Sequence, residues 1–327
     1  MFPRAQFNFN AISNDDCIKN FRFNKTQVQA LVKLFEMEGI RTRERTVATG
    51  VEALCIVLYK LAVPLRWCDL ERFFGRKASG LSNLFLHVIE YLDKRYHDLL
   101  YFHHDYAAQN LQTYADAVFD AGGLMQNVWA FVDGTVRGIC RPKPRNCRRD
   151  GNYRSQKSVY NGHKRKHALK YQTISTPDGL IIHLYGPFPG RNHDIKLFKE
   201  AGIARVIKDD TRFQMFRIFG DQAYGNDEVL VSPFAGAVGN LTVDQKRVNK
   251  SMSKVRVSVE WGYGQVTNYW TALDFKRQAR SGTQPVGSMY RIGVLLNNCL
   301  TCANGGNTIS DYFHLAPPSL HEYLKRT

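Results

Sequence analysis

The sequence has no hydrophobic run long enough to cross a membrane. Its longest apolar stretch, residues 51–63, is interrupted by Glu52, Tyr59 and Lys60 and is shorter than the ~20 residues that a membrane-spanning helix needs. The first ten residues, MFPRAQFNFN, also lack the basic and then apolar layout of a secretory signal. We therefore expect no membrane partner and a reducing, intracellular setting.

The cysteine pattern excludes a disulfide framework. The seven cysteines are odd in number and scattered along the chain, whereas disulfide scaffolds are short and cysteine-rich. Cys299 and Cys302 form the only CxxC, and no second Cys or His pair follows at zinc-finger spacing. We interpret these two residues as core thiols on a buried helix, with zinc binding as the less favoured alternative.

Acidic residues are scarce relative to basic ones. The 45 Lys and Arg exceed the 29 Asp and Glu by 16, and the sequence pI is about 9.6. A pI above ~9 is typical of proteins whose partners are nucleic acids or anionic membranes. The hydrophobic content of 44% is that of an ordinary globular protein, and 327 residues are enough for about two domains.

The first third of the chain has the apolar spacing of helices, which is clearest in residues 28–35 and 51–58. The stretch LRWCDLERFFGRKASGLSNLFLHVIEYL then predicts a helix, a stop at Gly75 and a second helix that starts at Ser79. This layout is that of a helix-turn-helix, although a structural helix pair is the alternative. If this element binds DNA, the side chains around the start of the second helix could contact phosphates or bases: Arg76, Lys77, Ser82 and Asn83.

From residue 128 the pattern changes to strands mixed with helices. Short apolar strands are expected at 128–132, 169–174, 180–185 and 216–219, with a turn at 177–179. Helical segments follow, so the second part of the chain is predicted to be α/β, a mixed sheet flanked by helices.

Two acids stand directly after predicted strands, Asp133 and Asp221. If the two strands are parallel neighbours, both carboxylates lie at one edge of the sheet, where open α/β sheets bind ligands. Carboxylates that close repel one another unless a divalent cation lies between them. Oxygen ligands suit Mg²⁺ or Mn²⁺. The alternative for Asp133 is that Asp-Gly after a strand marks only a turn.

A predicted amphipathic helix over residues 256–272 supplies a third acid. Its apolar stripe leaves Glu260 at the margin, and Arg256 lies four residues earlier on the same flank. Two interpretations of Arg256 remain open, an i,i+4 ion pair with Glu260 and a phosphate clamp or orienter of Glu260.

These segments carry a resemblance. FVDGT, YGPFPGRNHD, IFGDQAYG and the run from Asn249 to VEWGYG, in this order, resemble the DDE transposases of the PIF/Harbinger superfamily over residues 128–298. The helical segment ALCIVLYKLAVPLRWCDLERFFGR also resembles the region that precedes the nuclease in that superfamily. The resemblance implies an RNase H-like fold whose catalytic triad binds two divalent ions, Mg²⁺ or Mn²⁺. The matching positions are Asp133, Asp221 and Glu260.

The helical and strand patterns and the resemblance together predict the division of the chain. It comprises an N-terminal extension (1–26), an all-helical domain with the helix-turn-helix-like hairpin (27–100), a connecting helical segment (101–127), an RNase H-like DDE nuclease domain (128–303) and a C-terminal tail (304–327).

Asp194, in the segment NHDIKLF, has two interpretations. It is either a helix N-cap or an additional acid near the metals, since GRNHD occurs as a unit in the superfamily.

About a dozen Lys and Arg lie between residues 137 and 170, against the single acid Asp150. Such a run is either a solvated face or a track for the DNA backbone, and its place between the first two strands of the site favours the track. Within it, His163–His167 (HKRKH) is a weak candidate for nuclear import. The expected DNA contacts are Arg145, Arg148, Arg149, Arg154, Lys157, Lys164, Arg165 and Lys166, together with Arg256.

The implied function is a DNA transposase that cleaves phosphodiester bonds at transposon ends and transfers the 3′-OH to target DNA. Its partners would be double-stranded DNA at terminal repeats and target sites, a Myb/SANT-like accessory protein and further copies of the chain on the DNA. We expect it in the nucleus, with the cytoplasm as an alternative location. Two rival hypotheses are a domesticated DNA-binding or regulatory protein that keeps the fold, and a metal-dependent nuclease without strand transfer.

Overall fold

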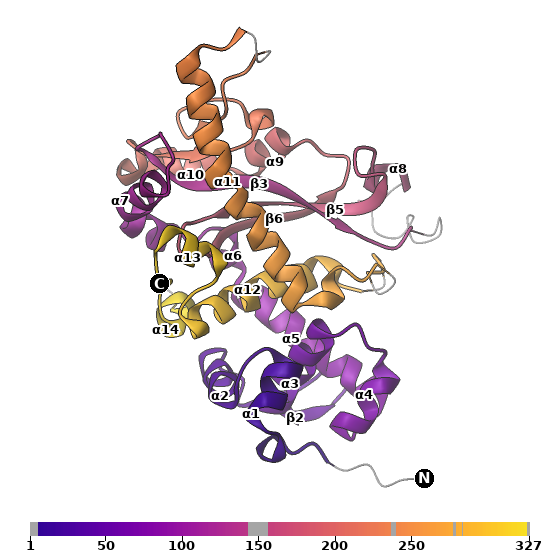
Figure 1. The fold of residues 1–327 in the computed structure, drawn as a ribbon. Helices are drawn as coiled ribbons and strands as arrows, with labels where there is room; N and C mark the ends of the chain where they lie inside the picture. Colours follow the sequence, from indigo (N-terminus) through magenta and orange to yellow (C-terminus); the bar gives the residue numbers. More distant parts are fainter. Residues whose placement is uncertain (1–5, 143–155, 237–239, 277–278, 283, 326–327) are drawn as a thin grey trace.

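The computed structural model describes residues 6–142, 156–236, 240–276, 279–282 and 284–325. A helical N-terminal part lies below a mixed sheet, and long helices from the second half of the chain connect the two (Figure 1). Within the described residues, no helix has both the length and the apolar character of a membrane span.

The N-terminal part is built mostly of helices, as predicted. Its elements are α1 (Asn14–Phe21), α2 (Lys25–Leu34), β1 (Gly39–Arg41), β2 (Val47–Thr49), α3 (Gly50–Ala62), α4 (Trp67–Phe74), α5 (Ala78–Arg95), α6 (His97–Tyr101) and α7 (His104–Asp120). The expectation of an all-helical domain is wrong in one respect, because β1 and β2 form an antiparallel hairpin. Strands of three residues are too short to produce a clear alternation in the sequence.

Helices α4 and α5 form the predicted hairpin. Gly75 ends α4 in the left-handed region, with φ 65°, where a residue without Cβ is favoured. Helix α5 begins at Ala78, one residue before the expected start at Ser79. The helix pair is present, while its assignment as a helix-turn-helix and its DNA-binding role stay predictions.

The sheet is mixed, with the order β6-β5-β3-β7-β8 and with β4 paired to one end of β5. Strand β5 runs antiparallel to both β3 and β6, whereas β7 is parallel to β3 and β8 is parallel to β7. The strands are β3 (Val128–Gly138), β4 (Tyr160–Asn161), β5 (Lys166–Ser175), β6 (Ile181–Pro189), β7 (Arg217–Phe219) and β8 (Leu230–Val231).

Strand β3 is longer than predicted. We expected it to end at residue 132 with Asp133-Gly134 as a turn, but it continues to Gly138. Its second half pairs with β5, from Val132 opposite Ile174 to Gly138 opposite Ala168. These ladder hydrogen bonds outweigh the local turn preference of Asp-Gly, so the turn alternative for Asp133 is wrong.

Helices from the second half of the chain flank the sheet (Figure 1). They are α8 (Gln156–Val159), α9 (Asp194–Ala201), α10 (Ile203–Asp209), α11 (Val243–Tyr269), α12 (Val286–Asn304), α13 (Thr308–Phe313) and α14 (Leu320–Leu324). Short 3-10 helices occur at Phe9–Ala11 (η1), Thr211–Phe213 (η3), Gln222–Tyr224 (η4) and Thr271–Leu273 (η6). The predicted helix 256–272 therefore begins thirteen residues earlier, at Val243, and ends at Tyr269.

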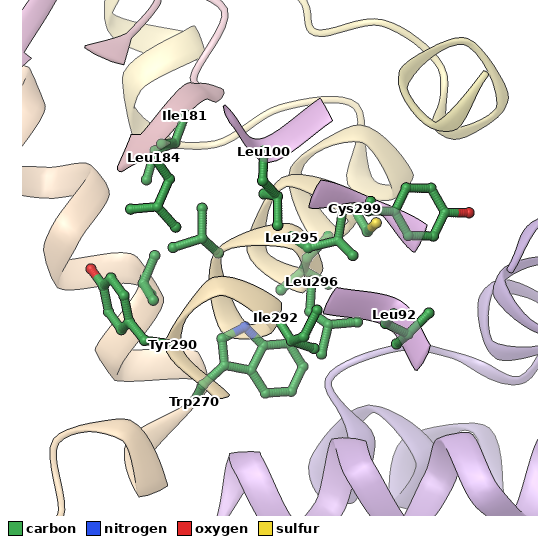
Figure 2. Packing of buried hydrophobic residues seen from close by; sticks show 14 of the residues in the cluster. Leu92, Leu100, Ile181, Leu184, Trp270, Tyr290, Ile292, Leu295, Leu296 and Cys299 are labelled. Atoms are coloured by element: carbon green, nitrogen blue, oxygen red, sulfur yellow. The ribbon is translucent and has the colours of Figure 1, made fainter. Parts of the chain in front are cut away.

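The core is continuous between the helical part and the sheet. Figure 2 shows α12 at its centre, with Leu92 of α5, Leu100 of α6 and Ile181 of β6 converging on it. Cys299 and Cys302 lie on α12 as buried free thiols. This confirms the interpretation of the CxxC pair as core residues.

Candidate active site

Asp133 lies on β3, and Asp221 follows the end of the neighbouring parallel strand β7 by two residues. Phe131 of β3 is the register partner of Phe219 of β7, and each aspartate follows its phenylalanine by two residues. Strands in a sheet are about 4.8 Å apart, and residues two apart share a face. The condition set by the sequence, parallel neighbouring strands, is therefore met. The Asp221 carboxylate also accepts the N–H of Ala223 at 3.0 Å and so begins η4.

The surroundings of Asp133 make its ionisation difficult. Burial raises the pKa of this carboxyl from 3.8 to about 6, and the nearby carboxylates Asp221 and Asp194 add to the increase. The Gly134 N–H and the Arg256 guanidinium act in the opposite direction. Aspartates from β3, from the end of β7 and from the start of α9 thus lie within electrostatic range of one another, and Arg256 of α11 lies within range of Asp133.

Helix α11 presents Arg256, Glu260 and Tyr263 along one flank. At about 100° per residue, Glu260 lies roughly 40° around the axis from Arg256 and roughly 60° from Tyr263. Arg256 lowers the pKa of Asp133, and Asp133 raises that of Tyr263, so both residues are close to Asp133. Glu260 lies between them along the axis and is exposed. Helix geometry therefore puts the third acid of the predicted triad beside this flank, but the main charged influences on the pKa of Asp133 do not include Glu260.

The two interpretations of Arg256 can now be compared. Among the described residues, Arg256 forms no ion pair with Glu260, so the i,i+4 ion-pair alternative is wrong. Its proximity to Asp133 keeps the roles of phosphate clamp or orienter available.

The structure distinguishes between the two interpretations of Asp194, a helix N-cap and an additional acid near the metals. The N-cap of α9 is His193, and Asp194 is the first residue of the helix, so the capping interpretation is wrong. The Asp194 carboxylate instead accepts from Lys170 Nζ at 2.9 Å through Oδ2, while its Oδ1 is buried without a hydrogen-bond partner. A Cβ at Gly134 would lie 1.9 Å from this Oδ1. Glycine at position 134 therefore makes room for the Asp194 carboxylate next to Asp133.

Several residues around the aspartates were missed by the sequence analysis. Lys170 belongs to the basic run but is buried on β5, where it also donates to Asn192 O at 3.0 Å. Its position in a predicted apolar strand was the available signal. Tyr263 bonds to Thr173 of β5 through its hydroxyl. Its spacing of three residues from Glu260 indicated that it shares the flank of that acid.

The predicted DNA contacts of the helical part lie at the start of α5. The Arg76 guanidinium donates to both carboxylate oxygens of Glu52, at 2.5 and 2.8 Å, so a base contact would require this pair to open. Lys77 is exposed, whereas Ser82 and Asn83 are partly buried.

The basic run is described only in part. Arg145, Arg148, Arg149 and Arg154 lie outside the described residues. Lys157 is exposed on α8, Lys164 and Arg165 are exposed in the β4–β5 turn, and Lys166 is partly buried at the start of β5.

The aspartate cluster suits a divalent cation by its donor chemistry. Among the described residues, no three His, Cys, Asp or Glu side chains stand close enough together to form a complete metal site. Three features nevertheless fit an ion: donors that are all carboxylate oxygens, a buried Asp194 Oδ1 without a partner, and mutual repulsion that raises the pKa of Asp133. A divalent cation relieves such repulsion, and oxygen donors are the ligands of Mg²⁺ and Mn²⁺.

The comparison with family models decides the classification. The model of the DDE superfamily endonucleases matches residues 132–298, which is just over half of the 327 residues. The chain belongs to the DDE superfamily endonucleases. No curated protein and no solved structure matches it.

This DDE superfamily endonuclease has its aspartates inside the matched region. The match begins one residue before Asp133, includes Asp194, Asp221 and Glu260, and ends within α12. The mixed sheet flanked by helices is consistent with a DDE nuclease fold. The family implies DNA as the substrate and an enzyme that cuts it, and its members normally use divalent metals.

Proposed function

We propose that this DDE superfamily endonuclease is a transposase of the PIF/Harbinger type, which cleaves DNA at transposon ends and transfers the 3′-OH to target DNA. The observation that supports this most directly is the register of β3 and β7, which brings Asp133 and Asp221 together on neighbouring parallel strands. The order β6-β5-β3-β7-β8, with three antiparallel and then two parallel strands, supports the RNase H-like assignment.

In this proposal Asp133, Asp221 and Glu260 hold two divalent ions, Mg²⁺ or Mn²⁺, and Asp194 is a further candidate ligand. Bound divalent cations activate the attacking hydroxyl and stabilise the leaving oxygen of an in-line phosphoryl displacement. Asp133 has a raised pKa, so it retains a proton at mildly acidic pH and becomes a full carboxylate ligand as the pH rises.

The other residues of the site position and shield these acids. The ammonium group of Lys170 holds Asp194 in place at 2.9 Å. Tyr224 is buried near the three aspartates, and the Tyr263 hydroxyl is fixed by Thr173, so these rings exclude water from one side. Arg256 provides a positive charge near Asp133, where it orients Glu260 or contacts a phosphate of the bound strand.

The remaining partners follow from the resemblance. We propose that the chain acts on duplex DNA as a homo-oligomer, together with a Myb/SANT-like accessory protein, in the nucleus. Four of the predicted DNA contacts have exposed side chains that DNA could reach: Lys77, Lys157, Lys164 and Arg165.

The test uses the full chain and duplex DNA that carries terminal repeats, with Mg²⁺ or Mn²⁺. We expect Asp133→Asn, Asp221→Asn and Glu260→Gln each to reduce cleavage by at least about 100-fold, as loss of an inner ligand should exceed the 10- to 100-fold cost of losing an outer one. Asp244→Asn is the matched control, because Asp244 is an exposed acid at the start of α11.

Each outcome selects one hypothesis. Equal cleavage by the wild type and the three variants would reject the triad. DNA binding without cleavage by the wild type would favour a domesticated regulatory protein. Cleavage without joined products would favour a plain metal-dependent nuclease.

A further inference from the structure

The first half of α11 is a basic face that no part of the site accounts for. Lys246, Arg247, Lys250 and Lys254 are all exposed. At about 100° per residue they fall within an arc of roughly 100°. The buried residues Met252, Val255 and Val259 occupy the opposite side of the helix. We call these four residues the α11 basic face.

This half of the helix makes few contacts with the rest of the protein. It extends beyond the sheet at the top of Figure 1, and none of its residues before Met252 is buried. A capping box between Thr242 and Gln245 supports its first turn. The Asn249 side chain fixes it to the backbone of Phe234 through two hydrogen bonds, at 2.9 and 3.1 Å.

The charges on the α11 basic face oppose the stability of the helix that presents them. Lys246, Lys250 and Lys254 repeat every four residues, and like charges at this spacing repel. Lys246 and Arg247 also lie close to the helix N-terminus, where the helix dipole disfavours cations. None of the four cations forms an ion pair within the described part of the chain. A bound polyanion would relieve both effects at once.

The α11 basic face lies before the site along the same helix. Lys254 precedes Glu260 by six residues, or about 9 Å of helix, but points about 160° away from Arg256 around the axis, so the basic face is turned away from the flank that faces Asp133. We propose that the α11 basic face is a DNA-binding surface, which contacts the phosphate backbone of duplex DNA beyond the stretch that is held at Asp133 and Asp221. The proposal deepens the proposed function, since it takes DNA as the substrate of that same site.

Duplex DNA fits the dimensions of this face. From Lys246 to Lys254 the helix rises about 12 Å. Over that length a DNA duplex carries roughly seven phosphate charges, at one per ~1.7 Å. The face has no exposed aromatic ring for base stacking among its four residues, so we expect contacts to the backbone, without sequence preference.

The experiment compares two quadruple variants of the full chain, each with four fewer positive charges. The first neutralises the α11 basic face with Lys246→Gln, Arg247→Gln, Lys250→Gln and Lys254→Gln. The control neutralises four exposed cations that are scattered over other elements, with Lys19→Gln, Lys33→Gln, Lys94→Gln and Lys325→Gln. Both sets are surface residues, and circular dichroism checks that both variants are folded.

Affinity for a labelled 40-base-pair duplex is measured between 50 and 300 mM salt, without divalent cations and with Asp133→Asn in every protein. We expect the α11 variant to bind at least 10-fold more weakly than the parent at 150 mM salt. The slope of log affinity against log salt should become shallower by about 3 to 4, at ~0.9 per phosphate contact. The control should change the slope by less than half of that.

The proposal would be overturned if the α11 variant and the scattered control lost the same affinity for DNA, or if both changed the slope of log affinity against log salt by the same amount. The measurement does not depend on cleavage, because all proteins carry Asp133→Asn. If the wild type does not cleave DNA in the test described above, but binding still depends on the α11 basic face, the proposed function is refuted and this inference stands.

Discussion

The buried carboxylate of Asp133 destabilises the folded protein when no cation is bound to it. Its pKa is raised from 3.8 to about 6, chiefly by burial and then by Asp221 and Asp194. The folded protein therefore binds a proton more tightly than the unfolded chain does. The stability from this group is fully present below about pH 4 and is lost as the pH rises through about 6. Ionised Asp133 costs at most about 3 kcal/mol at pH 7 without bound cations.

This cost leads to a prediction for Asp133→Asn. In EDTA at pH 8 the variant should have a free energy of unfolding about 1 to 3 kcal/mol higher than the wild type, because the amide removes the buried charge. Below pH 4 the two proteins should be equally stable. Chemical unfolding across this pH range measures the difference. Asp244→Asn, at an exposed position, should change little at any pH. A variant that is less stable at pH 8 than the wild type would contradict the burial argument.

At the scale of elements, the sequence predicts best where apolar periodicity is strong. The strands around Leu169–Ile174 and the buried stripe of α11 were predictable, because regular burial leaves a regular pattern. A shared site for Asp133 and Asp221 required that the strands before them be parallel neighbours, and β3 and β7 are paired in this way.

Elements whose structure depends on distant partners were not predictable. Nothing local in the sequence extends β3 past the Asp-Gly pair, because its second half is held by β5. The start of α11 at Val243 is a different case: its capping box, Thr242 with Gln245, is a local signal, but it was missed because no apolar stripe precedes Met252. The basic run was treated as one surface, yet Lys170 contacts Asp194, because β5 is covered on both faces from Ala168 to Ser175.

One ion pair joins an element of the helical part to an element of the nuclease part. Arg291 of α12 donates to both carboxylate oxygens of Asp93 of α5, each at 2.6 Å. It also donates to the carbonyl oxygen of Gly186 at 3.0 Å. The two side chains are only 22% and 17% exposed, so this is a largely buried bidentate pair.

Breaking this pair from one side should be costly. We expect Asp93→Ala to lower the free energy of unfolding by about 2 to 4 kcal/mol, because it leaves the Arg291 guanidinium buried without its partner. Glu200→Ala removes one member of the exposed pair with Lys196 and should cost less than about 0.5 kcal/mol. Chemical denaturation of both variants gives the comparison. Equal effects would mean that the α5–α12 contact depends on apolar packing alone.

For the whole molecule, the decisive feature is that one core serves both parts of the chain. Phe23 of the helical part stacks on Trp270 at the end of α11, with ring centroids 6.3 Å apart. Leu92 and Trp270 lie on opposite sides of the same apolar region in Figure 2. A core shared in this way fixes the α4–α5 hairpin in relation to the aspartates. Any DNA held by the hairpin therefore approaches the site in a defined direction.

A shared core also predicts a single unfolding transition. Trp67 lies in α4 and Trp129 in β3, so the difference in fluorescence between the wild type and Trp67→Phe, or between the wild type and Trp129→Phe, reports on each part separately. We expect their thermal transitions to coincide, since the two parts cannot lose their common apolar contacts independently. The calorimetric and van't Hoff enthalpies should agree for the same reason. An earlier transition at Trp67 would show that the helical part unfolds alone. In that case the contacts of α5 with α12 would be too weak to orient bound DNA.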